Sequence, residues 1–221
     1  MRIFVAGSGS SGNCYLLVCQ DEAMVLDAGV RFLEAKKALD FNIKMIRGVL
    51  ITHEHGDHHA FAHEYEAAGI PVWRPYDAKS QRQTRRFGSF TIHSFECVHN
   101  VPCVGYLIEH PACGRVLYVT DTEYVKYRFK DLWAIIIEAN YQKAILGRYE
   151  ANREHVLRGH MAIETACEFL KANDNQELKT VLLCHLSDGH SNEAEFLSAA
   201  QNAVNPWCTV YAASAGMEIE I

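Results

Sequence analysis

Histidine and carboxylate side chains fill one short stretch of the sequence, HEHGDHH at residues 53–59. The stretch directly follows an apolar run, so its side chains emerge where a strand ends, the usual place for ligand sites in α/β folds. Because residues i and i+2 of an extended segment point the same way, His53 and His55 can share one metal ion. Asp57 and His58 can turn toward a second ion. Imidazole and carboxylate ligands together suit zinc or manganese.

Three further residues extend this set of candidate metal ligands. His99, Asp121 and His185 each stand at or just after an apolar run that is typical of a strand. Taken singly, each is better explained as a hydrogen-bonded turn residue, and the 53–59 stretch has a solvated polar loop as its alternative. Two metal ions need more ligands than that stretch offers, which favours including all three. The full set of candidate ligands is His53, His55, Asp57, His58, His99, Asp121 and His185.

The periodicity of apolar residues predicts the elements that position these side chains. Strands are expected at 2–6, 14–19, 23–27, 48–52, 90–97, 105–109, 116–120, 133–138, 180–184, near Val210 and at 218–221. Helices are expected at 31–41, 58–68, 161–172 and 192–203. Antiparallel strands followed by strand and helix alternation predict two packed sheets with helices on the outside. Since the sequence contains neither a long linker nor a repeat, one domain over residues 1–221 is expected.

Length and composition place the chain among ordinary folded proteins. It has 221 residues, of which 49% are hydrophobic and 22% charged, and this excludes disordered and fibrous classes. A net charge of −6 argues against a protein that coats DNA through bulk positive charge. The apolar runs are far shorter than a membrane span, and the first residues lack the apolar segment of a signal peptide. We therefore expect a cytoplasmic protein without a membrane segment.

The eight cysteines are scattered along the chain, without a CxxC spacing and with several inside apolar runs. In a cytoplasmic protein such cysteines are reduced core residues as a rule. The sequence therefore predicts free thiols.

In order along the chain, several motifs resemble those of the metallo-β-lactamase superfamily. They are Leu26-Asp27-Ala28-Gly29, the stretch from Thr52 to His58, His99, Thr120-Asp121-Thr122 and Cys184-His185-Leu186-Ser187. The resemblance covers nearly the whole chain. It implies an α/β (α+β) fold, the four-layer αβ/βα sandwich of two mixed β-sheets with helices on the outer faces.

The resemblance also implies a role for each candidate ligand. One metal ion would be held by His53, His55 and His99, the other by Asp57, His58 and His185, with Asp121 bridging both. Asp27 would support the ligand loop by hydrogen bonds without binding metal. A water molecule between the ions would be the nucleophile, because divalent metals lower the pKa of bound water toward ~7. Asp57 could also orient that water or accept its proton.

Other motifs separate the branches of this superfamily. Asp121 stands where the zinc β-lactamases have cysteine, and residues 99–106 lack the Gly-His-Thr-x-Gly-like element of glyoxalase-type thioesterases. The loop GSGSSGN at residues 7–13 resembles the amino-terminal signature of the YycJ/WalJ group of nucleases. Gly159-His160-Met161 resembles the same group and RNase Z, and the resemblance implies that His160 protonates the leaving oxygen.

Glu138 matches the residue of that module that orients this histidine. The alternatives are a helix-start cap for His160 and a polar strand end for Glu138. Only 21 residues separate the two positions, so neither a β-CASP insertion nor the tRNA-gripping arm of RNase Z is expected.

Two sets of basic residues could meet nucleic-acid phosphates, with solvated helix faces as the alternative. They are Lys79, Arg82, Arg85 and Arg86, then Arg148, Arg153 and Arg158. The loop at 7–13 could likewise offer donors to a phosphate or be a plain turn.

Together these observations predict a binuclear metal-dependent hydrolase with two divalent ions, zinc or manganese. The favoured substrate is a phosphodiester bond in DNA or RNA, which makes a nuclease or phosphodiesterase. A hydrolase of a small ester, thioester, lactone or cyclic phosphodiester is the first alternative, and a catalytically silent metal-binding protein is the second. The sequence leaves open the oligomeric state and the choice between exonuclease and endonuclease action.

Overall fold

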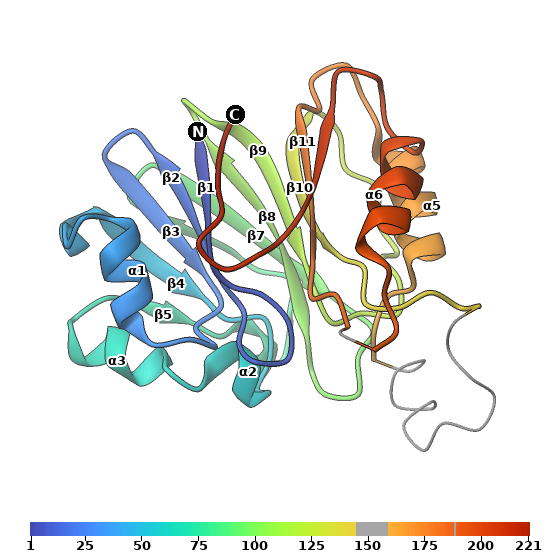
Figure 1. The fold of residues 1–221 in the computed structure, drawn as a ribbon. Helices are drawn as coiled ribbons and strands as arrows, with labels where there is room; N and C mark the ends of the chain where they lie inside the picture. Colours follow the sequence, from blue (N-terminus) through green and yellow to red (C-terminus); the bar gives the residue numbers. More distant parts are fainter. Residues whose placement is uncertain (145–158, 188) are drawn as a thin grey trace.

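The computed structural model describes residues 1–144, 159–187 and 189–221, so Arg148, Arg153 and Arg158 lie outside the described residues. Two β-sheets pack face to face, with helices on the outer side of each (Figure 1). This arrangement confirms the expected four-layer sandwich of two mixed sheets. None of the helices in the described ranges has the length and apolar character needed to cross a bilayer.

Within the described residues, the first sheet has six strands in the order β13-β1-β2-β3-β4-β5. Its strands are β1 (Arg2–Gly7), β2 (Cys14–Cys19), β3 (Glu22–Leu26), β4 (Ile46–Leu50), β5 (Val72–Trp73) and β13 (Glu218–Glu220). The first three strands are antiparallel to one another, whereas β3, β4 and β5 run parallel. On this side lie α1 (Phe32–Ala38), α2 (Gly56–His59), α3 (Ala62–Ala67) and the 3₁₀ turns η1 (Ile43–Met45) and η2 (Pro75–Asp77).

In the part of the chain that the structure describes, the second sheet has seven strands in the order β12-β11-β10-β9-β8-β7-β6. Its strands are β6 (Thr84–Phe87), β7 (Phe90–Glu96), β8 (Val104–His110), β9 (Gly114–Val119), β10 (Leu132–Glu138), β11 (Thr180–Cys184) and β12 (Thr209–Ala212). Strands β6 to β9 are antiparallel, and β9 to β12 are parallel. The outer face is covered by α5 (Ile163–Asn173) and α6 (Glu193–Gln201).

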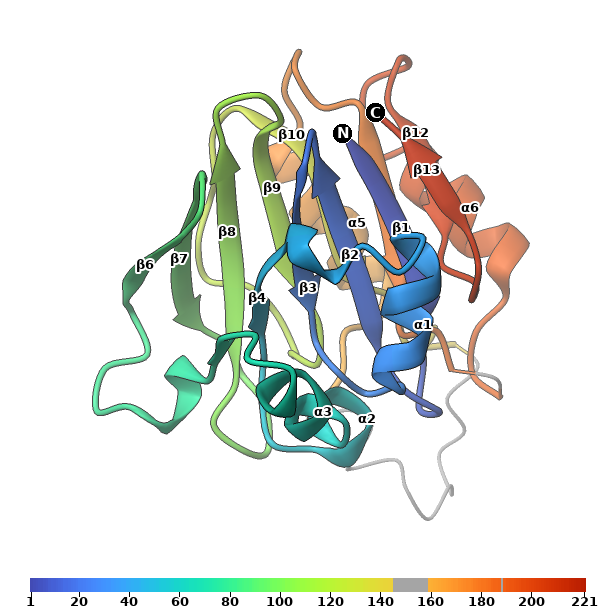
Figure 2. The ribbon, with the colours of Figure 1, turned by 90° about the vertical axis from the view of Figure 1, so that its left-hand side faces the viewer.

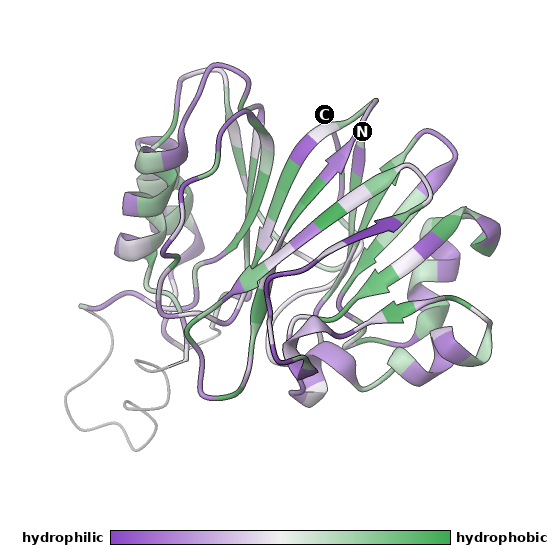
Figure 3. Cartoon of the chain, turned by 180° about the vertical axis from the view of Figure 1, so that it is seen from behind, coloured by the Kyte–Doolittle hydropathy of each residue, from purple (hydrophilic) through white to green (hydrophobic). Residues whose placement is uncertain are grey.

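The core explains why the central strands are almost wholly apolar. One buried cluster fills the space between the sheets and under α1, and a second lies between the second sheet and α5 and α6. A strand in such a layer is covered on both faces, so it reads as a continuous apolar run. Strand β2 is accordingly buried along its whole length. Figure 3 shows hydrophobic residues along the strands and hydrophilic residues spread over the helices.

The parallel strands bring several chain segments to one end of the sandwich. The carboxyl ends of β3 and β4 are neighbours in the first sheet, and those of β9, β10 and β11 are neighbours in the second. Helix α2 lies at this end, and both termini lie at the other end (Figures 1 and 2). Residues that directly follow these strands therefore gather on one rim.

Two helices differ from the sequence prediction. The helix expected at 31–41 ends at Ala38, because Asp40 and Phe41 take positive φ angles of 48° and 62°. The helix expected at 58–68 is divided into α2 and α3. There the Phe61 amide donates to the Ala28 carbonyl, and the Ala28 amide donates to the His58 carbonyl. These bonds bend the chain toward the loop after β3 and so interrupt the helix.

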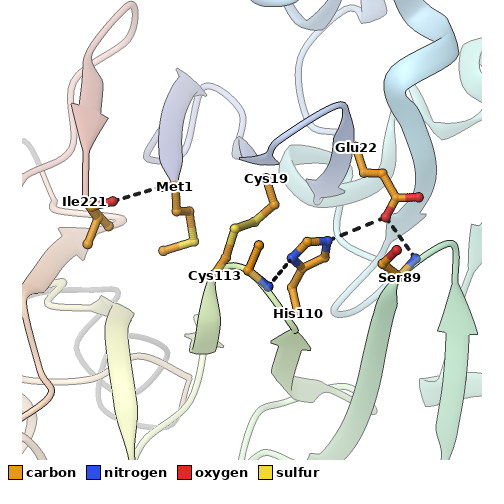
Figure 4. The surroundings of a disulfide bond; sticks show 8 residues. Met1, Cys19, Glu22, Ser89, His110, Cys113 and Ile221 are labelled. Atoms are coloured by element: carbon orange, nitrogen blue, oxygen red, sulfur yellow. Dashed lines mark hydrogen bonds and ion pairs between the residues drawn. A yellow bond between two sulfur atoms is a disulfide. The ribbon is translucent and has the colours of Figure 1, made fainter.

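Two other expectations were wrong. Cys19 and Cys113 form a disulfide across 94 residues of sequence, although free thiols were expected (Figure 4). Arg85 and Arg86 lie on strand β6, an exposed edge strand, and not on a solvated helix face.

Candidate metal centre

The carboxylate of Asp27, fully buried just after β3, holds the segment that carries the first candidate ligands. It accepts hydrogen bonds from the Thr52 amide at 2.8 Å and the Thr52 hydroxyl at 3.0 Å. It also accepts one from Tyr118 Oη at 2.6 Å and one from His58 Nδ1 at 2.8 Å. Because His58 Nδ1 donates to this carboxylate, Nε2 of His58 is left to face the rim. This is the supporting role that the resemblance implied for Asp27.

Three histidines converge beside it. His55 Nδ1 lies 3.1 Å from His53 Nε2 and 3.2 Å from His99 Nε2. The other nitrogen of His53 lies 3.0 Å from the Thr52 hydroxyl, and His99 Nδ1 donates to the Gly159 carbonyl at 2.7 Å. For His53 and His99, one ring nitrogen is thus held by the protein while the other points at a common centre, as in metal-binding histidines.

A second group forms next to the first. Asp57 Oδ2 lies 3.3 Å from both His58 Nε2 and His185 Nε2. The loop at residues 7–13 closes this side, since Ser8 Oγ accepts from the His185 amide at 3.1 Å. Asn13 Nδ2 lies 3.1 Å from His58 Nε2. The loop therefore contacts two of the candidate ligands, His58 and His185, rather than forming a separate turn.

Asp121 lies between the two groups and is almost fully buried. Its Oδ2 lies 3.7 Å from His53 Nε2 and 4.0 Å from His99 Nε2. Its Oδ1 lies 3.3 Å from His58 Nε2 and 3.6 Å from His185 Nδ1. One carboxylate oxygen therefore faces each group of histidines.

Glu138 and His160 form a pair at the edge of this cluster. His160 Nδ1 donates to Glu138 Oε1 at 2.7 Å, and the same nitrogen lies 3.8 Å from Asp121 Oδ2. The fully buried Glu138 carboxylate also accepts from the Met161 amide at 3.0 Å. The residue that caps α5 is Ala162, so the alternative of a helix-start cap for His160 was wrong.

Neighbouring charges set the protonation of these groups. Burial alone would lower the pKa of His185, but Asp121 and the other carboxylates raise it to about 10. Burial likewise opposes protonation of His160, yet Glu138 raises the pKa of His160 above its usual value. Burial and the adjacent imidazoles lower the pKa of His53 to about 2. Burial would raise the pKa of Asp121, but His185 and the other imidazoles hold it well below its usual value.

The donor set fits divalent cations. The candidate ligand residues form two groups, and within each group the ligand atoms lie within 4.8 Å of one another. The first group is His53, His55, His99 and Asp121, and the second is Asp57, His58 and His185. All seven residues selected from the sequence are therefore brought together. Imidazoles bind metal ions in the neutral form and carboxylates in the ionised form, so metal binding would release the proton that the neighbouring carboxylates favour on His185.

Three residues of the cluster stand just after a strand and have a positive φ angle, which sets the direction of their side chains. Asp27, Asp121 and His185 follow β3, β9 and β11 and have φ angles of 58°, 49° and 53°. Positive φ in a residue other than glycine is uncommon and clusters at functional sites. Sequence reasoning missed the contacts of Tyr118 and Asn13, although Asn13 ends the glycine-rich loop that was singled out.

Comparisons with known proteins show that the chain is similar to members of the metallo-β-lactamase superfamily. Residues 7–95 match the family described as Metallo-beta-lactamase superfamily. Over 91% of its length the chain is 28% identical to the Exodeoxyribonuclease YycJ of Bacillus anthracis, of which 88% is covered. This match confirms the resemblance to the YycJ/WalJ group.

Solved structures have the same fold. The metallo-β-lactamase fold protein YhfI from Bacillus subtilis is 19% identical with a TM-score of 0.74, covering 99% of this chain and 98% of that one. The short form of human tRNase Z is 16% identical with a TM-score of 0.64, covering 100% of this chain and 99% of that one.

Replacing Asp27 should destabilise the protein. Asp27→Asn puts an amide NH₂ among groups that all donate, so we expect the free energy of unfolding to fall by about 2 to 3 kcal/mol. Urea unfolding with a chelator present measures this effect apart from metal binding. The exposed Asp40→Asn should leave the midpoint unchanged. Equal stability of Asp27→Asn and the parent protein would contradict the role of this carboxylate.

Proposed function

We propose that this protein is a binuclear metal-dependent nuclease that hydrolyses phosphodiester bonds in nucleic acid. The observation that carries the proposal is the likeness to an exodeoxyribonuclease over 91% of the chain. Exonuclease action on DNA is the mode that this relative's name suggests. A single catalytic domain over residues 1–221 and a cytoplasmic location, which suits a nucleic-acid substrate, belong to the same proposal.

The ligand assignment supports two ions, zinc or manganese. We assign His53, His55 and His99 to one ion, Asp57, His58 and His185 to the other, and Asp121 to both. The distances from Asp121 Oδ1 and Oδ2 to histidines of the two groups support a bridging role. Bound divalent ions would lower the pKa of water and neutralise charge on the attacked phosphate.

The Glu138 and His160 pair supports acid catalysis. Because Glu138 raises the pKa of His160, the imidazole keeps its second proton to a higher pH than an ordinary histidine does. His160 lies at the edge of the cluster, 13% exposed in its side chain, so it can reach a bound substrate. It would donate this proton to the departing oxygen, while Glu138 holds its Nδ1 and fixes the ring.

Asp57 would act on the attacking side. Burial would raise the pKa of Asp57, but hydrogen bonds from His185 and His58 keep it well below its usual value. The carboxylate is therefore ionised at neutral pH, and it can orient a water molecule or accept its proton.

Cations outside the cluster support a nucleic-acid substrate. Arg85 and Arg86 are exposed on β6, as is Lys79 before it. Arg82 is engaged with Glu96 at 3.0 Å and lies over the Tyr127 ring. The net charge of −6 favours a second candidate, a hydrolase of a small ester, thioester, lactone or cyclic phosphodiester.

A cleavage assay separates the two candidates. End-labelled single-stranded and double-stranded DNA and RNA are incubated with zinc-loaded or manganese-loaded protein, and products are resolved on a gel. We expect metal-dependent cleavage, abolished by chelation and lowered at least ~100-fold in Asp57→Ala. Absence of cleavage with both metals bound would overturn the nuclease proposal, and turnover of small esters or cyclic phosphodiesters would then establish the second candidate.

Removing the proposed bridge should change metal content. Because Asp121 is assigned to both ions, Asp121→Ala should bind fewer than two ions per chain after dialysis, as measured by elemental analysis. Glu168→Ala, an exposed carboxylate on α5, is the matched control and should keep both. Retention of two ions by Asp121→Ala would refute the bridging assignment.

Removing the proposed acid should leave the metals in place. His160→Ala should keep both ions yet lower kcat by roughly 10²- to 10⁴-fold, the usual contribution of general acid catalysis. His63→Ala, an exposed histidine on α3, should have no effect on either quantity. An unchanged kcat in His160→Ala would exclude the acid role, and loss of metal would instead make His160 a ligand.

A further inference from the structure

We propose that Cys19, Cys113 and His110 form a second metal site that binds zinc when the disulfide is reduced. This site lies at the opposite end of the sandwich from the histidine and carboxylate cluster described above, which is called the first cluster below. Cys19 ends β2 in the first sheet, whereas His110 ends β8 and Cys113 follows it in the second. A metal ion held by these residues would join the two sheets, as the disulfide does (Figure 4).

The ligand atoms are already close together. One atom of each of the three residues lies within 4.8 Å of the others. All three residues are buried, with exposed fractions of 1% for Cys19, 6% for His110 and 3% for Cys113. Thiolates and imidazole are the ligands that zinc prefers in structural sites. The two sulfur ligands distinguish this site from the histidine and carboxylate cluster.

The hydrogen bonds of His110 prepare it as a ligand. The Ala112 amide donates to His110 Nδ1 at 3.2 Å, so Nδ1 holds a lone pair and Nε2 holds the proton. That Nε2 lies 3.6 Å from Glu22 Oε2, and Figure 4 shows the ring between Glu22 and the disulfide. A metal ion would take the place of the amide at Nδ1.

Glu22 completes the arrangement behind the ring. Its carboxylate is fixed by Arg47 Nε at 2.8 Å and by the Ser89 amide at 2.8 Å. Burial would raise the pKa of Glu22, but these donors lower it, so the carboxylate is ionised. A carboxylate behind a histidine is the usual partner of a zinc-binding imidazole, because it fixes the ring and raises its basicity.

The two states of the cluster exclude each other chemically. A dithiol reductant gives two electrons and two protons to the disulfide, becomes a disulfide itself, and leaves two thiols at Cys19 and Cys113. Zinc then replaces the two thiol protons, which are released to solvent. A surface cavity of about 610 Å³, lined in part by His110, Ser89 and Gly114, gives solvent access to this region. In the reverse step a small-molecule disulfide would accept two electrons from the two thiolates and become two thiols with protons from solvent, so that the ion is released and the sulfur–sulfur bond is restored.

Cobalt substitution tests the proposal, because thiolate ligands give Co²⁺ a near-ultraviolet charge-transfer band that imidazoles and carboxylates do not give. Full-length protein is stripped with a chelator, either oxidised or reduced with a phosphine, and titrated with Co²⁺. We expect the band in the reduced protein alone, with one more ion bound per chain than in the oxidised protein. Absence of the band after complete reduction, verified by counting alkylated thiols, would overturn the proposal.

Variants assign the band to its ligands. Cys113→Ser and, as a second variant, Cys19→Ser should each abolish it, whereas Cys167→Ser on α5 should keep it. His110→Ala should still form the disulfide on oxidation but bind Co²⁺ at least ~10-fold more weakly when reduced, which a purely structural disulfide does not predict.

Cys103 is the necessary further control, because its Sγ lies 3.9 Å from His53 Nδ1 in the first cluster. Cys103→Ser should retain the band. Loss of the band in Cys103→Ser, with retention in Cys113→Ser, would place the thiolate in the first cluster and overturn the proposal.

Discussion

The buried carboxylate of Asp27 is the interaction on which the site depends. A carboxyl group without exposed surface is tolerated only when hydrogen-bond partners surround it. Here the donors come from Thr52 after β4, from His58 on α2 and from Tyr118 on β9. The same carboxylate therefore joins the two sheets, fixes the start of the ligand loop and sets which nitrogen of His58 faces the rim. The positions of the candidate ligands and the packing of the two sheets therefore both depend on the Asp27 carboxylate.

Ligand positions are fixed by a common pattern around the cluster. Several histidines give one ring nitrogen to the protein and turn the other to the centre: His99 bonds the Gly159 carbonyl, and His58 bonds Asp27. His160 gives Nδ1 to Glu138 in the same way. An imidazole whose outer nitrogen is hydrogen-bonded to the protein cannot rotate out of the cluster. The close approach of the imidazoles is therefore maintained by hydrogen bonds on the side of each ring that faces away from the cluster. The pattern explains how so many titratable groups remain ordered in a buried place.

The sequence predicted what is encoded locally. The candidate ligands were recognisable because they follow apolar runs, and parallel strands bring such positions to one rim. Most strands of the two sheets followed from the same runs, but β5 and β6 were not predicted. Contacts between distant segments were not recognisable. Tyr118 reaches Asp27 across 91 residues, and the Cys19–Cys113 disulfide spans 94. The division of the helix at 58–68 has the same origin, since backbone bonds to Ala28 override a favourable helical pattern.

Apolar packing alone does not fix how far one sheet is shifted along the other. Two specific links between the sheets, the Tyr118–Asp27 hydrogen bond and the Cys19–Cys113 disulfide, limit this shift at opposite ends of the sandwich. Packed side chains fix the separation of two sheets well, but several ways of sliding one sheet over the other bury similar areas. His53, His55 and His58 come from the first sheet, whereas His99, Asp121 and His185 come from the second. Because ligand distances of a metal ion vary by only about 0.2 Å, the relative slide of the sheets must be fixed closely. The Tyr118 hydroxyl on Asp27 limits this slide at the rim, and the cysteine pair limits it at the far end.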